Sequence, residues 1–133
     1  MLYFSIVLSQ FVFLQLMKRS IKHDPQACSK KMLPIQDALQ ILSGKWKLPI
    51  LVALMFDVKR FSDLSKEIPK ITDRMLSKEL KDLEMNKLVK RTVYDTFPVT
   101  VEYTMTEYGR SLKKVIEALG EWGEKHREKI MRE

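Results

Sequence analysis

The stretch from Thr72 to Arg91, TDRMLSKELKDLEMNKLVKR, decides the fold. Thr72 is a residue type that caps helices, and Asp73 in the first turn suits the positive end of the helix dipole. Apolar residues then recur at helical spacing and form a core-facing stripe of Met75, Leu76, Leu80 and Leu83. The other side carries Asp73, Arg74, Ser77, Lys78 and Lys81. We therefore predict a helix with a basic outer face that ends near Asn86.

Two β-prone runs follow this helix. The first is LVKRTVYD, residues 88–95, and the second is VTVEYTMT, residues 99–106, in which Val, Tyr and Met alternate with Thr and Glu. Alternation with a period of two is typical of a strand with one buried face. The residues between the two runs, DTFP, are suited to a turn, so the pair is predicted to form a β-hairpin.

Three shorter helices are predicted before the basic helix. The first is expected near residues 34–42 with Pro34 in its first turn, and the second lies in KWKLPILVALMF. The third is expected near residues 63–67, with Ser62 as its N-cap. FDVKR, between the second and third helices, is expected to be a short extended connector. Residues 20–32 are polar and are expected to be a linker or arm, with Asp24-Pro25 as a helix breaker.

A long last helix is predicted from Glu107 to the C-terminus. Its apolar stripe is too extensive for so small a domain to cover alone, so we expect another surface to pack against it. The expected interface residues are Leu112, Val115, Ile116, Leu119 and Trp122.

The order of these elements is that of a winged helix-turn-helix. The expected fold class is mainly α with a small antiparallel β-hairpin, α+β, closed by a long C-terminal dimerisation helix. In such a fold the basic helix lies in the DNA major groove, and the hairpin reaches the backbone or the minor groove. The expected contacts of the recognition helix are Thr72, Asp73, Arg74, Ser77, Lys78 and Lys81. Those of the wing and its flanks are Lys45, Lys59, Arg60, Ser62, Lys90, Arg91, Tyr94 and Thr100.

The composition agrees with a nucleic-acid partner and argues against an enzyme. The 133 residues hold 24 Lys+Arg against 17 Asp+Glu, and the net charge of +7 favours a polyanion, either nucleic acid or an anionic membrane surface. The sequence carries no glycine-rich phosphate loop, no nucleophile–base pair and no cluster of metal ligands. We expect no catalytic residues, no metal and no cofactor.

The first seventeen residues, MLYFSIVLSQFVFLQLM, are uncharged and differ from the rest of the chain. Three readings stay open: a weak membrane anchor, an extra helix that packs on the domain or a partner chain, or residues 1–16 translated upstream of a true start at Met17. The expected organisation is an apolar segment and polar arm over residues 1–33. Residues 34–133 then form the winged helix-turn-helix domain with its C-terminal helix.

Five stretches together resemble the HxlR-type family of winged helix regulators, which are related to the MarR type. The resemblance extends across nearly all of residues 28–122. It rests on the stretches ILSGKWKLPIL, RFSDLSKEIPKIT, MLSKELKDLE, LVKRTVYDTFPVTVEYTMTEYGRSL and ALGEWGEKH. The resemblance implies a cytoplasmic homodimer that binds a pseudo-palindromic operator in double-stranded DNA, with one recognition helix per half-site. It also implies an effector that the sequence does not identify, and no membrane partner is expected.

Cys28 is the single cysteine of the chain, so an intramolecular disulfide is impossible and a reducing compartment is expected. Several members of the family use a cysteine near the N-terminus to sense oxidants or electrophiles, and the resemblance makes Cys28 a candidate redox sensor. The family usually places this cysteine directly before the proline that opens the first helix. Here CSKKMLP separates Cys28 from Pro34.

The leading hypothesis is therefore a sequence-specific transcriptional regulator, a repressor or autoregulator, that responds to a thiol signal or a small molecule. The alternative is a winged helix that serves as a protein-interaction or membrane-recruited module without specific DNA readout.

Overall fold

The computed structural model describes residues 25–132. The apolar run before Met17 and the start of the polar arm lie outside the described residues. The chain divides into two compact units, Met1–Gln40 and Ile41–Glu133. Helix α2 (Pro25–Leu42) makes up the described part of the first unit and runs into the second.

The expectation of a linker through residue 32 is wrong for residues 25–32, which belong to α2. A proline at the first helical position costs nothing, because its missing N–H has no partner there in any case. Pro25 therefore opens a helix instead of breaking one, and the Gln, Ala, Lys and Met residues that follow are good helix formers. Pro34, expected in the first turn, lies inside this helix.

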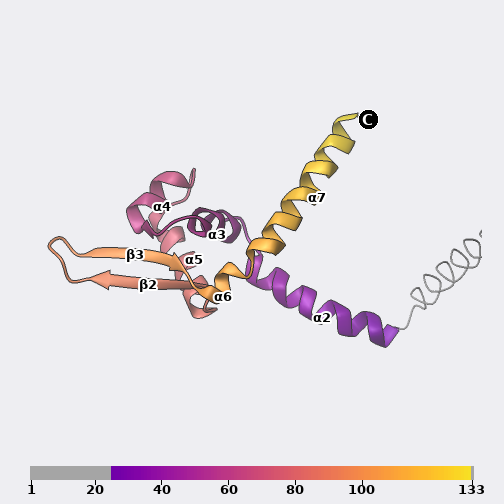
Figure 1. Ribbon diagram of the computed structural model, residues 1–133, viewed down its shortest axis with the longest axis horizontal. Coiled ribbons are helices and arrows are strands. Elements are labelled where there is room, and N and C mark those ends of the chain that lie inside the picture. Colours follow the sequence, from indigo (N-terminus) through magenta and orange to yellow (C-terminus); the bar gives the residue numbers. More distant parts are fainter. Residues whose placement is uncertain (1–24, 133) are drawn as a thin grey trace, which may run out of the picture. The chain divides into compact units, whose positions relative to one another are not determined.

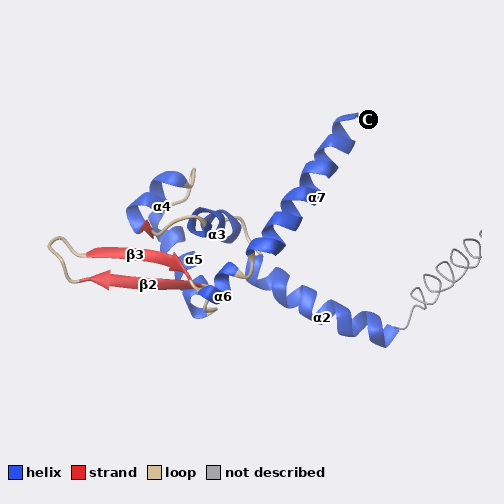
Figure 2. Ribbon diagram, viewed as in Figure 1, coloured by secondary structure: helices blue, strands red, loops and turns tan. Residues whose placement is uncertain are grey.

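The second unit has the predicted winged helix-turn-helix order (Figures 1 and 2). Its elements are α3 (Lys47–Met55), β1 (Lys59–Arg60), α4 (Phe61–Glu67), α5 (Asp73–Met85), β2 (Val89–Tyr94), β3 (Thr100–Met105), α6 (Glu107–Arg110) and α7 (Lys113–Arg132). The hairpin of β2 and β3 is confirmed as a long antiparallel ribbon, with Arg91 opposite Tyr103 and Tyr94 opposite Thr100.

A third strand joins this ribbon. The sheet has the order β1-β3-β2, and Lys59 and Arg60 pair antiparallel with Tyr103 and Glu102. The description of FDVKR as a mere connector is thus incomplete. Two residues are too few to carry an alternating pattern, so the sequence gives no local signal for β1.

The core lies where α3, α4, α5 and the sheet meet. Ile50, Leu51 and Leu54 of α3 pack there with Leu64 of α4, and from α5 come Leu76, Leu80 and Leu83. The prediction was wrong for Met75, which is 38% exposed. The buried residues of α5 follow the spacing i, i+4, i+7, and Met75 precedes them by one position, at the edge of the stripe.

The predicted single last helix is divided in two. Helix α6 ends at Arg110, and α7 begins at Lys113. The start of α6 is fixed to the end of α5: Thr106 donates from its backbone N–H to the Leu88 carbonyl at 3.0 Å, and its hydroxyl donates to the Lys87 carbonyl at 2.7 Å. Gly109 lies against the same carbonyl, where an added Cβ would stand 2.2 Å from the Leu88 oxygen. At the break itself the backbone forms tighter turns, in which the Ser111 N–H donates to the Tyr108 carbonyl and the Leu112 N–H donates to the Gly109 carbonyl.

Within residues 25–132, no single helix is both long and apolar enough to cross a membrane. Helices α2 and α3 meet that criterion only when they are taken together as a bent pair.

Candidate nucleic-acid interface

The turn between α4 and α5 is fixed at both of its ends. Lys70 in this turn has a left-handed backbone, with φ of 66°. The Thr72 hydroxyl accepts a hydrogen bond from the Met75 N–H at 3.2 Å, which confirms Thr72 as the N-cap of α5. The Ser65 hydroxyl of α4 donates to the Asp73 carboxylate of α5 at 2.6 Å. The direction of α5 relative to α4 is thus set by side chains, and Asp73, an expected DNA contact, is engaged within the protein.

Two acidic residues of α5, Glu79 and Asp82, lie on its core side, away from the exposed basic residues. Glu79 and Asp82 turn toward α3, where Lys47 Nζ lies 3.3 Å from Glu79 Oε2 and 3.9 Å from Asp82 Oδ2. The predicted contact residues Arg74, Ser77, Lys78 and Lys81 on the outer face are all exposed. The three cations among them form no ion pair with any described residue. No carboxylate of the described residues within salt-bridge distance therefore neutralises the positive charges of Arg74, Lys78 and Lys81.

The flanking cations differ in how much of their charge is free. Lys59 Nζ lies 2.6 Å from Glu67 Oε1, and this hydrogen bond, with the nearby negative charge, raises the pKa of Lys59. Lys45 Nζ stands 4.9 Å from the centre of the Trp46 ring, a cation–π geometry. Lys59 is accordingly a weaker candidate for phosphate contact than the sequence indicates, because a carboxylate already neutralises it.

Ser62 is not the N-cap of α4, contrary to the prediction. The N-cap is Arg60, and the helix begins at Phe61, two residues earlier than predicted, so that Ser62 lies exposed in its first turn. The Asp63 carboxylate reaches back and accepts a hydrogen bond from the Arg60 N–H at 3.0 Å. Since a carboxylate at this position can satisfy the first amide, no serine cap is needed.

The wing presents both cations and apolar groups to solvent. Lys90, Arg91 and Tyr94 of β2 are exposed, and Thr100 of β3 is partly buried opposite Tyr94. Phe97, in the turn at the tip, is fully exposed. The sequence predicts a turn here but no exposed aromatic side chain.

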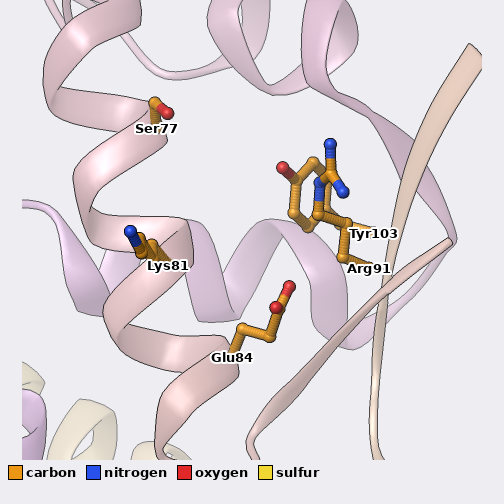
Figure 3. Close-up of a pocket in the computed structure, with 5 residues that line it drawn as sticks. All are labelled: Ser77, Lys81, Glu84, Arg91 and Tyr103. Atoms are coloured by element: carbon orange, nitrogen blue, oxygen red, sulfur yellow. The ribbon is translucent and has the colours of Figure 1, made fainter. Parts of the chain in front are cut away.

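A hollow of about 230 Å³ lies between α5 and the ribbon. Its lining residues come from three elements: Ser77, Lys81 and Glu84 of α5, Arg91 of β2 and Tyr103 of β3 (Figure 3). Three of these five were predicted DNA contacts. The other two, Glu84 and Tyr103, were missed; the alternating pattern of β3 marked Tyr103 only as a residue of the inner face.

The predicted dimer set falls into two groups. Leu112 and Ile116 pack against the core of their own unit. Val115, Leu119 and Trp122 are 44%, 52% and 68% exposed, and α7 has no buried residue. The Trp122 ring stacks on His126 with ring centres 5.0 Å apart. An apolar strip of α7 is therefore left open to solvent in a single chain.

Cys28 is exposed on α2, in the other compact unit. Among residues 25–132 there is no group of three or more His, Cys, Asp or Glu residues that is able to hold a metal ion.

Comparisons with known proteins agree with this geometry. The HxlR-like helix-turn-helix family matches residues 41–131. The HTH-type transcriptional regulator YdeP of Bacillus subtilis (strain 168) is 43% identical over 97 residues, which are 73% of this chain and 76% of YdeP.

Two solved structures share the fold. The redox regulator HypR in its reduced form is 36% identical, with a TM-score of 0.70 over 75% of this chain and 99% of HypR. The reduced form of the transcriptional regulator YodB from B. subtilis is 37% identical, with a TM-score of 0.62 over 67% of this chain and 87% of YodB. The chain belongs to the HxlR-like helix-turn-helix family and is a DNA-binding transcriptional regulator, not an enzyme.

Proposed function

We propose that this regulator recognises a specific DNA sequence through the outer face of α5 and acts in the cytoplasm as a repressor or autoregulator. The observation that carries this proposal is the separation of charge on α5. Two of its acidic residues, Glu79 and Asp82, pair with Lys47 on the core side. Arg74, Lys78 and Lys81 stay exposed and form no ion pair within the described chain. Exposed cations on a helix fixed at its N-terminus match what major-groove reading requires.

Arg74 and Lys78 are one helical turn apart and repel each other mildly. Such a pair does not stabilise a surface helix that has no anionic partner. On a helix that faces phosphates and guanine edges, both cations can form favourable contacts with the DNA. Arg74, in the first turn, is the residue assigned to base contact, because the N-terminal part of a recognition helix reaches deepest into the groove.

The functional unit is a homodimer. The exposed strip of Val115, Leu119 and Trp122 on α7 has the composition of an interface core, and aromatic anchors are common in such places. A two-fold dimer implies a pseudo-palindromic operator with half-site centres about 34 Å apart. Changes in the spacing of the two α5 helices would then control affinity.

Cys28 is the proposed site of a thiol response. Its side chain is exposed, and one exposed cysteine per chain permits an intermolecular disulfide across a dimer. The relatives HypR and YodB have been solved in reduced form, and HypR is described as a redox regulator. Cys28→Ser is expected to abolish any change of operator affinity caused by oxidant. An equal oxidant response in this variant would exclude Cys28.

Specific DNA binding is tested with DNA from the region upstream of the protein's own gene and with random DNA, over a series of salt concentrations. We expect preferential binding to the upstream DNA at physiological salt, and loss of that preference in Arg74→Ala. Lys129→Ala, which removes one positive charge near the end of α7, is the matched control and is expected to keep the preference. Equal, salt-sensitive binding to both DNAs would overturn the assignment of a specific reader.

The dimer is tested by sedimentation of Leu119→Glu, which puts a charge in the middle of the exposed strip. We expect monomers at micromolar concentration. The control is Glu121→Lys, about 160° around the helix from Leu119, which is expected to leave the dimer intact. Dimers of unchanged stability in Leu119→Glu would place the interface elsewhere.

A further inference from the structure

The hollow between α5 and the ribbon is lined by a hydroxyl group that has no hydrogen-bond partner within the described part of the chain. Tyr103 is only 7% exposed, yet its hydroxyl forms no hydrogen bond within the described part of the chain. The ring extends from β3 toward α5, and the hydroxyl is at its inner end (Figure 3). A tyrosine hydroxyl can donate a hydrogen bond, so one that faces a hollow is able to bind an acceptor placed there.

The charges around this hydroxyl define the kind of acceptor that fits. Lys81 and Arg91 line the hollow from opposite walls, α5 and β2, and neither forms an ion pair among the described residues. Glu84 is the one carboxylate in the lining and is also without an ion pair. Two cations against one carboxylate leave one net positive charge, which suits a singly charged anion.

We propose that this hollow receives one phosphate group of the DNA backbone. The Tyr103 hydroxyl donates a hydrogen bond to a phosphate oxygen, and Lys81 and Arg91 supply the opposite charge. Glu84 opposes the phosphate and so limits how tightly any DNA is held. This inference rests on the proposed function and adds to it two residues, Tyr103 and Glu84, that act on affinity and not on base choice.

The position of the hollow selects a backbone phosphate over a small free anion. Ser77 and Lys81 belong both to the outer face of α5 and to the lining. A DNA strand that passes from the groove occupied by α5 to the wing must cross the space between them. Phosphates along a strand are spaced closely enough that one of them meets the hollow.

The first test measures the affinity of Tyr103→Phe for the operator and for random DNA. The change removes only the hydroxyl and keeps the ring that packs in the core. We expect affinity for both DNAs to fall about tenfold, because a phosphate contact carries no sequence information. The dependence on salt stays unchanged, since no charge is lost. Tyr108→Phe, on the exposed Tyr108 of α6, is the control and is expected to bind as the unmodified protein does.

The second test uses the charges. Lys81→Gln and Arg91→Gln are each expected to weaken binding to both DNAs and to reduce the slope of log affinity against log salt by about 0.9. Glu84→Gln is expected to strengthen binding to both DNAs severalfold. Glu121→Gln removes the same charge on α7 and is expected to have a much smaller effect.

The outcomes separate this inference from the proposed function. If Arg74→Ala loses operator preference but Tyr103→Phe binds both DNAs normally, the reader is established and the phosphate site is refuted. If the unmodified protein shows no operator preference but Tyr103→Phe weakens all binding, the phosphate site stands without the specific reader. A titration with inorganic phosphate, followed by amide NMR shifts, gives the third result: millimolar binding in the hollow, with normal DNA affinity of Tyr103→Phe, would mean that the site takes a free anion instead.

Discussion

Adding a single methyl group at Gly109 is expected to lower the free energy of unfolding by several kcal/mol. A Cβ added there would stand 2.2 Å from the Leu88 carbonyl oxygen, whereas ordinary contact begins at 3.4 Å. The backbone of α6 must therefore move by about 1 Å in Gly109→Ala. That carbonyl also accepts the Thr106 N–H at 3.0 Å. The Thr106 hydroxyl donates to the neighbouring Lys87 carbonyl at 2.7 Å and lies 3.1 Å from the Leu88 oxygen, so the movement strains both hydrogen bonds of Thr106.

The expected cost can be worked out from these contacts. Two hydrogen bonds at about 1 kcal/mol each, plus about 1–3 kcal/mol for overpacking, give a loss of about 3–5 kcal/mol. The better helix propensity of alanine returns less than about 1 kcal/mol. A net loss of about 3 kcal/mol corresponds to a fall in Tm of about 12–24 °C for a domain of this size.

Thermal unfolding followed by circular dichroism measures this fall directly. Gly120→Ala is the matched control, because a Cβ at Gly120 meets nothing within 4 Å in this chain. It lies inside α7, where alanine is expected to raise the free energy of unfolding by about 0.5–1 kcal/mol. A Tm for Gly109→Ala within about 2 °C of the unmodified protein would refute the close approach of α6 to Leu88.

Three further substitutions test other local contacts, each measured by denaturant unfolding. Lys47→Met leaves the mostly buried Glu79 carboxylate without its cation and is expected to lower the free energy of unfolding by about 2 kcal/mol. The control Lys113→Met, at an exposed ion pair, is expected to lower it by less than about 0.5 kcal/mol. Similar values for the two variants would contradict the account. Lys87→Gly relieves a left-handed backbone with φ of 61° and is expected to gain about 0.5–1 kcal/mol, and a loss would show that the lysine side chain contributes more than the strain costs. Thr72→Ala removes the N-cap of α5 and is expected to cost about 1 kcal/mol, so unchanged stability would mean that the cap hydrogen bond is dispensable.

The parts of the fold that were predicted correctly have local signals. Helix α5 has a capping threonine, a clear helical period and an asparagine at its end, and all of these lie within the helix or next to it. The β2–β3 ribbon has alternation and turn residues. The helix-turn-helix order then follows from the sequence of elements alone.

The parts that were predicted wrongly depend on residues distant in the sequence. The position of α6 depends on Leu88, which lies against Gly109 although the two residues are far apart in the chain. Strand β1 forms because Lys59 and Arg60 pair with the edge of β3, which lies far away in the sequence. The start of α2 is different, because Pro25 is compatible both with the break that was predicted and with the first helical turn that is observed.

The candidate site shows the same division. The basic outer face of α5 follows from its periodicity, because residues opposite a buried stripe must be exposed. The pairing of Lys59 with Glu67 does not follow, since it requires the positions of β1 and α4. Tyr103 and Glu84 come from different elements, and their meeting in one hollow depends on how α5 lies on the sheet.

Base-pair discrimination by Arg74→Ala tests the central claim most directly, namely that the outer face of α5 reads DNA. The measurement compares the affinity of the unmodified protein and of the variant for the operator and for a set of operators with single base-pair changes. We predict that the variant loses about 1–3 kcal/mol of discrimination at one base pair in each half-site and keeps its discrimination elsewhere. An unchanged pattern of discrimination at every position would contradict the account, because α5 would then bind without reading the sequence through Arg74.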